Sequence, residues 1–207
     1  MVIRGKTTVR CPACSTQAEV ELVQSINTRD NPADKAKLLA GELNLLECGT
    51  CGKRTQLAAN VLFHDPEAGY YCQVVPGGET AMREADAAFA ASGVSGTQRL
   101  VPSLNALVEK VKILDAGLAD WAVEMNKILL LSSIGELDRV LLFAAVDRDK
   151  RVLRWVLFDE EGRSPEPVSS PLDNYEKLAM RHQAVTDRRI DRAWALEAIK
   201  SLIADAN

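Results

Sequence analysis

Alternating apolar and polar residues near the start of the chain predict two short strands around a pair of cysteines. In residues 18–23, alanine, valine and leucine alternate with glutamate, a period of two that is typical of a half-buried strand. Residues 7–10, on the other side of Cys11 and Cys14, are also strand-like. The pattern therefore predicts a strand, a tight turn that carries the two cysteines, and a second strand.

A short helix and two further strand-like runs are predicted next. Asn31 is placed to cap a helix that has Pro32 at its first position and ends at Gly41. Residues 43–46 lead into a second pair of cysteines, and residues 55–63 leave it. We therefore expect the two cysteine-bearing turns to be separated by an inserted helix.

The pattern changes after residues 76–78, whose sequence Pro-Gly-Gly predicts a break. Beyond it, apolar residues recur at the spacing of a helix face. The predicted helices are residues 81–91, residues 104–114 with Ser103 as cap, and a segment after Gly117 that presents Leu118, Trp121, Met125, Ile128 and Leu129. The last two helices are expected to form a helical hairpin or one kinked helix.

The last third of the chain predicts a β-hairpin, a loop and a helix. Residues 139–146 and 152–158 are rich in β-forming residues and are joined by a short charged segment, which favours a hairpin. Residues 160–162 are expected to turn the chain. Residues 164–171 contain three prolines and are predicted to be a loop, whereas residues 190–203 predict an amphipathic helix.

Together these elements predict an α+β protein with two domains. Residues 1–76 are expected to form a zinc-ribbon-like, β-rich domain with a helical insertion. Residues 77–207 are expected to form a second α+β domain that contains the helical hairpin, the β-hairpin and the carboxy-terminal helix. A chain of 207 residues is long enough to bury two separate cores.

Composition and charge narrow the class of protein. With 47% apolar and 26% charged residues, the chain has the composition of an ordinary globular protein. Its first residues lack the apolar core of a secretory signal, and runs such as residues 140–146 are far shorter than the roughly 20 residues that span a membrane. We therefore expect a soluble, cytoplasmic protein. The net charge is −4, and residues 1–76 contain eight basic and eight acidic residues, which excludes a strongly basic nucleic-acid surface there.

Four of the five cysteines form two Cys-x-x-Cys pairs, Cys11 with Cys14 and Cys48 with Cys51. Two cysteines three residues apart on a tight turn can direct both thiolates at one ion. Two such turns supply the four ligands of a tetrahedral Zn²⁺. We therefore predict a zinc site made of these four cysteines. Because four thiolates leave no position for water, the zinc is expected to be structural and not catalytic.

The residues that follow the two pairs differ. Gly52 can adopt the left-handed conformation that suits such a turn, whereas Ser15 occupies the equivalent position after the first pair. The strain at Ser15 costs on the order of 1 kcal/mol, which is small beside the roughly 10 kcal/mol or more of a structural zinc. The alternatives are a rubredoxin-like iron site, which has the same spacing, and a redox-active disulfide. Few aromatic residues accompany the cysteines, and neither pair opens a helix in a βαβ unit, so zinc is favoured.

Several spaced motifs resemble the bacterial CpXC family, which is named for its two cysteine motifs. The resemblance covers roughly residues 5–130. It is carried by Cys11-Pro12-Ala13-Cys14, Ile26-Asn27-Thr28, Asn31-Pro32, Gly41-Glu42-Leu43-Asn44, Cys48-Gly49-Thr50-Cys51-Gly52, Leu62-Phe63-His64-Asp65, Arg99-Leu100-Val101, Leu107-Val108-Glu109-Lys110 and Gly117-Leu118-Ala119-Asp120. Gly49 stands where the family has proline, and glycine is compatible with the turn. The resemblance implies a cysteine-rich domain without an established biochemical activity.

Two other groups of residues are candidates for chemistry. His64 and Asp65 follow an apolar strand and could transfer protons, but neighbouring strand residues face opposite sides, so a strand-end turn is favoured. The acidic residues around Gly117 could bind a divalent cation or a basic partner. A solvated helix face beside lysines is the favoured interpretation for this acidic group, which consists of Asp115, Asp120 and Glu124, with Lys110, Lys112 and Lys127 nearby.

The remaining polar and sulfur-containing candidates favour structural roles. Cys72 lies in a probable strand and is expected to be a small buried apolar residue. Asn27 and Asn44 are expected to satisfy backbone groups in turns.

A non-enzymatic protein-interaction or adaptor module with a structural zinc site is the function that the sequence favours. A protein partner is therefore expected, and neither a nucleic acid nor a membrane is. The first alternative is a nucleic-acid-binding zinc ribbon, which the neutral charge of residues 1–76 disfavours. The second alternative is an enzyme with a site near His64 and Asp65. His64 and His182 are the only histidines, and sequence motifs for phosphate binding or nucleophilic catalysis are not found.

Overall fold

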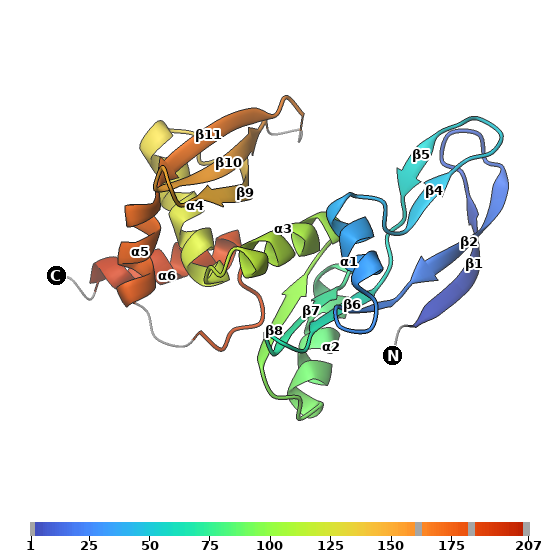
Figure 1. The fold of residues 1–207 in the computed structure, drawn as a ribbon, viewed down its shortest axis with the longest axis horizontal. Helices are drawn as coiled ribbons and strands as arrows, with labels where there is room; N and C mark the ends of the chain where they lie inside the picture. Colours follow the sequence, from blue (N-terminus) through green and yellow to red (C-terminus); the bar gives the residue numbers. More distant parts are fainter. Residues whose placement is uncertain (1–2, 160–162, 182–184, 205–207) are drawn as a thin grey trace. The chain divides into compact units, whose positions relative to one another are not determined.

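The structure is a computed structural model that describes residues 3–159, 163–181 and 185–204. It has the predicted α+β composition of helices and strands (Figure 1). The chain divides into two compact units, which we call the amino-terminal unit, Met1–Val108, and the carboxy-terminal unit, Glu109–Asn207. The predicted turn at residues 160–162 and the histidine at position 182 lie outside the described residues. Within the described residues, no helix is long and apolar enough to cross a membrane.

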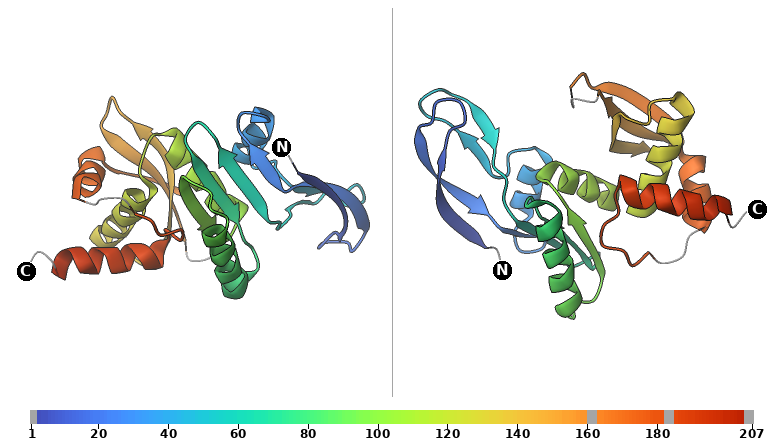
Figure 2. Two further views of the ribbon diagram at one scale, coloured as in Figure 1. Left: turned by 90° about the horizontal axis from the view of Figure 1, so that it is seen from below. Right: turned by 180° about the vertical axis from the view of Figure 1, so that it is seen from behind.

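The amino-terminal unit contains two hairpins, a mixed sheet and two helices. In chain order its elements are β1 (Arg4–Arg10), β2 (Gln17–Val23), β3 (Ser25–Asn27), α1 (Pro32–Leu39), β4 (Leu45–Glu47), β5 (Arg54–Gln56), β6 (Val61–Asp65), β7 (Tyr70–Val74), α2 (Gly78–Ala91) and β8 (Thr97–Val101). Strands β1 and β2 form one antiparallel hairpin, and β4 and β5 form another. The two hairpins lie side by side in all views (Figures 1 and 2). Each of them carries one cysteine pair at its turn.

A four-stranded sheet in the order β3-β6-β7-β8 is the core of this unit. Strand β3 is parallel to β6, so the chain between them must cross over, and this crossover contains α1 and the β4–β5 hairpin. Strands β7 and β8 are also parallel and are joined through α2, whose Met82 and Phe89 pack against Leu100. The second cysteine pair is therefore an insertion in a sheet that is built independently of it.

Helix α1 begins at Pro32 after Asn31, as predicted, but its cap differs in detail. The Asn31 side chain accepts no hydrogen bond from the first turn of the helix. It donates to the Asp34 carboxylate over 2.6 Å, and Arg4 donates to the same oxygen over 2.6 Å. Asp34 is buried in the first turn of α1, where a negative charge is favourable, and its contact with Arg4 ties α1 to β1.

The carboxy-terminal unit is built around one buried helix. Its elements are the second half of α3 (Leu104–Asp115), α4 (Asp120–Ile134), β9 (Val140–Asp147), β10 (Val152–Phe158), β11 (Glu166–Pro171), α5 (Leu172–Arg181) and α6 (Arg192–Ala204). One side of α4 packs its Val123 against Phe143 and Trp155 of the sheet, and another packs Met125 against Ala195 of α6. Helix α4 therefore lies between the sheet and α6 (Figure 2).

The predicted β-hairpin is confirmed, and the two helices predicted around Gly117 are both present. Ser103 caps α3 by accepting a hydrogen bond from the backbone N–H of Ala106 over 3.2 Å. Helices α3 and α4 are separated by a turn in which Gly117 has a φ of 67°, so they are two helices and not one kinked helix. Strands β9 and β10 are antiparallel, with a register shift between Arg154 and Trp155.

The prediction that residues 164–171 form a loop is wrong, because Glu166–Pro171 form β11. This strand pairs antiparallel with β10 alone and is therefore an edge strand. An edge strand leaves alternate N–H positions free of ladder hydrogen bonds, which makes its prolines tolerable. Strand β8 and helix α5 were not predicted.

The two compact units divide the chain at a different place from the domain boundary expected at residue 76. Strand β8 is hydrogen-bonded to β7, from Tyr70↔Thr97 to Val74↔Val101, so the chain beyond residue 76 completes the first sheet. A Pro-Gly-Gly break is visible in a sequence, whereas a parallel strand pair that spans such a break is not.

Candidate metal centre

The two cysteine turns have the same backbone construction. In the first, the N–H of Ser15 donates to the Cys11 carbonyl over 2.8 Å; in the second, Gly52 donates to the Cys48 carbonyl over 2.8 Å. Ser15 has a φ of 59° and Gly52 a φ of 69°, so both turns end in the left-handed conformation. The serine therefore adopts the strained conformation that the sequence predicts, at a cost of about 1 kcal/mol.

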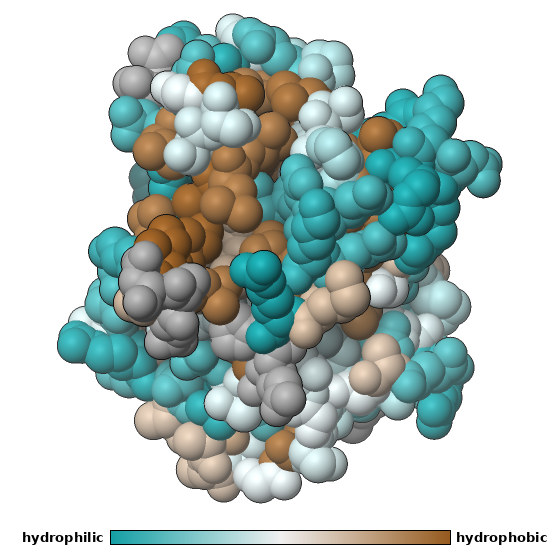
Figure 3. All heavy atoms as spheres, turned by 90° about the vertical axis from the view of Figure 1, so that its left-hand side faces the viewer, coloured by the Kyte–Doolittle hydropathy of each residue, from teal (hydrophilic) through white to brown (hydrophobic). Residues whose placement is uncertain are grey.

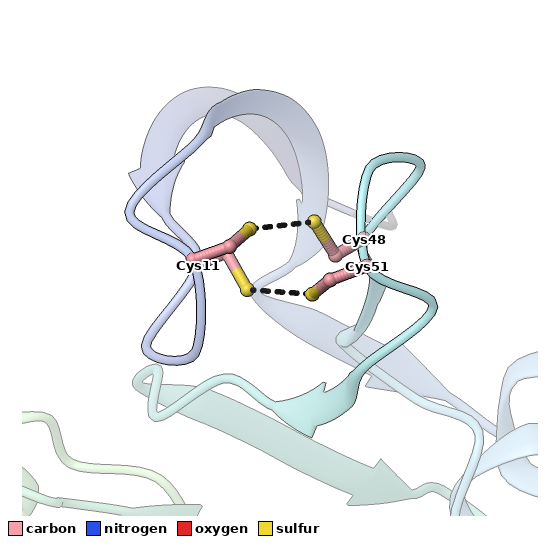
Figure 4. A group of neighbouring side chains, drawn as sticks. Cys11, Cys48 and Cys51 are labelled. Atoms are coloured by element: carbon pink, nitrogen blue, oxygen red, sulfur yellow. Dashed lines mark hydrogen bonds between the residues drawn. The ribbon is translucent and has the colours of Figure 1, made fainter.

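The four cysteine sulfurs face one another across the gap between the two hairpins (Figure 4). The Sγ atoms of Cys11 and Cys51 are 3.7 Å apart, and those of Cys14 and Cys48 are 3.5 Å apart. All four ligand atoms lie within 4.8 Å of one another. A tetrahedral ion with metal–sulfur bonds of about 2.3 Å requires sulfur–sulfur distances of about 3.8 Å. The spacing of the four sulfurs therefore fits one ion held by four thiolates.

The surroundings of the sulfurs favour thiolates at two of the four positions. The Thr16 hydroxyl, with help from its backbone N–H, lowers the pKa of Cys14 to about 6. Backbone N–H groups of Cys51 and Thr50 also lower the pKa of Cys48. At Cys51 the backbone N–H of Lys53 acts in the same direction. The neighbouring thiols of Cys14, Cys48 and Cys11, together with burial, outweigh it and raise the pKa of Cys51 to about 12. Four sulfurs this close compete for negative charge, and a bound cation removes that competition.

The comparison with protein families supports this interpretation of the cysteine turns. Residues 9–127 match the family described as CpXC protein, and this match includes both cysteine pairs. The chain belongs to the CpXC family. No curated protein and no solved structure matches the chain. The family match in this CpXC protein spans β1 to the middle of α4, so it extends from the cysteine turns into the carboxy-terminal unit.

The second sequence candidate, His64 with Asp65, is engaged in local structure. The His64 ring stacks on the Tyr71 ring, with centroids 4.2 Å apart and planes 8° apart. Asp65 accepts hydrogen bonds from the backbone N–H groups of Glu67 and Ala68 in the turn after β6. Both interactions agree with the strand-end turn that the sequence favours.

The acidic group of α3 and α4 is buried, and the prediction of a solvated face is wrong for most of it. Glu124 and Asp120 are 7% and 8% exposed, and Lys110 and Lys127 are as deeply buried. Lys110 contacts Asp120 at 2.9 Å, and Lys127 contacts Glu124 at 3.0 Å. Asp115, by contrast, is exposed. Lys110 and Lys127 therefore contact the acidic residues, as predicted, but their environment is the buried core and not the solvated face that was expected.

Glu109 completes this buried charge network, a role that was not predicted from the sequence. Its carboxylate contacts Lys127 at 2.8 Å and accepts a hydrogen bond from the backbone N–H of Phe143 in β9. Burial opposes the charge on Lys127, but Glu109 and Glu124 outweigh it and raise its pKa. Glu109 and Lys110 stand among apolar residues of a predicted helix. This position could have indicated that their charges are buried. The network ties α3, α4 and β9 together.

The structural roles predicted for the remaining polar and sulfur residues are consistent with their positions. Asn27 accepts hydrogen bonds from the backbone N–H groups of Arg29 and Asp30. Asn44 accepts from the Val23 N–H over 2.8 Å and donates to the Val23 carbonyl over 3.0 Å, so its amide joins the two cysteine hairpins. Cys72 is fully buried in β7.

Proposed function

We propose that this CpXC protein is a non-enzymatic protein-interaction module whose amino-terminal hairpins are held by a structural Zn²⁺. Cys11, Cys14, Cys48 and Cys51 would be the zinc ligands. The observation that carries the metal part of the proposal is the set of four mutually facing sulfurs, which leaves no position for water or substrate.

A shared metal ion is preferred over disulfides for two reasons of chemistry. A reducing cytoplasm, where we place the protein, keeps cysteine thiols free. The sulfur–sulfur distances of 3.5 and 3.7 Å suit a shared ion, whereas a disulfide requires about 2.05 Å. Metal analysis of the purified chain should give about one zinc ion per chain. A red protein that contains iron, or a chain that carries no metal and a disulfide, would refute this part.

The interaction role rests on two points. A metal held by four thiolates has no open position for catalysis, and large apolar side chains are exposed on the protein. Both members of the His64–Asp65 pair make local structural contacts, which weakens the enzyme alternative based on this motif. Large apolar side chains are exposed in the carboxy-terminal unit, among them Ile134, Leu137 and Met180. Figure 3 shows apolar residues gathered on one face of the molecule. Exposed apolar areas of this kind often contact other proteins.

The test is quantitative capture from the cells that make the protein. The wild-type chain should retain one partner protein near equal stoichiometry, and an Ile134→Asp, Met180→Asp variant should lose it. A Lys150→Asp, Lys200→Asp variant, which changes exposed residues elsewhere in the unit, should keep it. Repeated capture without a stoichiometric partner would contradict the interaction role.

Two further measurements separate the alternatives. Salt-dependent binding of DNA or RNA would favour the nucleic-acid alternative, although residues 1–76 are electrically neutral. Cellular function that is lost in a folded His64→Gln, Asp65→Asn variant would favour an enzyme. Full function in that variant is the expected result.

A further inference from the structure

A cavity of about 460 Å³ lies within the carboxy-terminal unit, between α4, β11 and α5. This volume falls within the range of about 300 to 1,000 Å³ that is usual for small-ligand sites. The cavity is remote in sequence from the cysteine turns and plays no part in the proposed metal centre. Its lining side chains are leucines on one hand and amide, hydroxyl and basic groups on the other.

A chain of hydrogen bonds leads from the core to the floor of this cavity. The indole N–H of Trp155 donates to the Ser170 hydroxyl oxygen over 2.9 Å. The Ser170 hydroxyl must therefore direct its own proton elsewhere, and it donates to Oδ1 of Asn126 over 3.3 Å. This order fixes the orientation of the Asn126 amide, with its Nδ2 group as the terminal donor of the chain.

The terminal donor has no acceptor among the described residues. Asn126 is 2% exposed, and its Nδ2 atom is buried without a hydrogen-bond partner. Buried polar groups are nearly always hydrogen-bonded, and an unpaired one is unfavourable. Because Asn126 lines the cavity, a bound group that presents an acceptor oxygen would complete the chain once the lining side chains separate slightly.

The charges around the cavity specify the sign of such a group. Lys177 and Arg181 are four residues apart on α5, so they share one face of the helix, and both line the cavity. None of the lining residues in the described part of the chain is acidic. Leu129, Leu130 and Leu178 form the apolar part of the lining.

We propose that this cavity binds a small amphiphilic anion. Its acidic headgroup, a carboxylate or a phosphate, contacts Lys177 and Arg181 and accepts a hydrogen bond from Asn126. Its short apolar chain packs against the three leucines. No covalent step is involved, so the site is a binding site and not a catalytic one. The inference does not rest on the zinc site or on a protein partner.

Titration by nuclear magnetic resonance tests the proposal on the full chain with its metal bound. The probes are octanoate and octyl phosphate, used below the concentrations at which they form micelles. Their binding should shift the indole N–H signal of Trp155 and the side-chain amide signals of Asn126, because both groups belong to the hydrogen-bonded chain. The indole signals of Trp121 and Trp194 serve as references in the same molecule. The two probes distinguish the two headgroups.

Two variants of equal charge change separate specific binding from general attraction. A Lys177→Glu, Arg181→Glu variant should lower the affinity for the better probe by at least about tenfold. A Lys150→Glu, Lys200→Glu variant should leave it within about twofold. All four side chains are on the surface, so both variants are expected to fold.

Several outcomes would overturn the proposal. These are the absence of a Trp155 shift with either anion, equal binding of octanol or octyltrimethylammonium, and equal loss of affinity in the two variants. Binding only of acidic peptides, without binding of either small anion, would also overturn it. Asn126→Ala adds a check, because it should abolish the coupled Trp155 shift in a chain that still contains both basic residues.

Discussion

Replacement of Cys14 by serine should unfold the two cysteine hairpins and leave the rest of the amino-terminal unit folded. Cys14→Ser removes one of four thiolates and changes the volume little. We expect β1, β2, β4 and β5 to lose their order together, because each hairpin carries only half of the ligand set. The sheet β3-β6-β7-β8 does not contain a ligand and should remain.

The burial of the hairpins shows how far they depend on the metal. Apart from the cysteines, the four strands bury only Val23 and Leu46 among their apolar residues. Full burial of two such side chains contributes roughly 3 to 6 kcal/mol. A structural zinc with four ligands contributes roughly 10 to 16 kcal/mol. A two-stranded hairpin is at best marginally stable alone, so these hairpins cannot remain ordered without the free energy that the bound metal contributes.

Hydrogen exchange with mass spectrometry measures this directly. In Cys14→Ser, or after strong chelation, peptides that cover residues 4–23 and 45–56 should lose their protection. Peptides that cover residues 61–74 should keep it, since Val61, Phe63 and Cys72 are fully buried in the sheet.

Cys72→Ser is the matched control, because it makes the same substitution at a buried cysteine that is not a ligand. It should destabilise the sheet by about 1 to 3 kcal/mol and leave the metal content unchanged. Retained protection of both hairpins in metal-free Cys14→Ser would refute the reasoning. Loss of protection throughout the amino-terminal unit would refute its local character.

Three further predictions concern interactions outside the metal ligands. Lys127→Met should lower the free energy of unfolding by about 3 to 5 kcal/mol, because it removes the buried ammonium group that Glu109 and Glu124 both contact. Lys200→Met, at an exposed ion pair, should lower it by only about 0 to 1 kcal/mol in chemical denaturation. Asn44→Ala should lower the free energy of unfolding by roughly 2 to 4 kcal/mol, because it removes two buried hydrogen bonds and leaves alanine at a φ of 53°. It should also speed the loss of metal to a chelator, and an unchanged rate of metal loss would argue against a link between the hairpins. The hydrogen bond from the Arg154 side chain lowers the pKa of Asp147 below its ordinary 3.8, so Asp147 stabilises the fold above pH 3.8 and loses this effect as the pH falls through its lowered pKa. The stability difference between the wild type and Asp147→Asn should therefore shrink in acid, and a difference that is independent of pH would contradict this.

Local features of the chain were predicted best. The helix that starts at Pro32 and the cap at Ser103 depend on a few neighbouring residues, and both are confirmed. The strained turn at Ser15 was expected because the second turn has glycine at the same place. Each of these features follows from backbone geometry within a few residues.

Features that depend on distant partners were missed or misjudged. Residues 164–171 were expected to be a loop because of their prolines, and only the pairing with β10 makes them a strand. The charged residues of α3 and α4 were expected on a solvated face. They are buried because two helices and a strand close around them, and that enclosure depends on contacts between segments far apart in the chain.

The sequence by itself determined the four cysteines, their spacing, the order of most elements and the CpXC resemblance, because each of these is a property of adjacent residues. Only the tertiary structure decided that the four sulfurs meet, that β8 completes the first sheet, and that Asn126 ends a hydrogen-bonded chain at a basic cavity. Burial and unmet hydrogen bonds arise from what the folded chain places around a group. A linear pattern of residues does not contain that information.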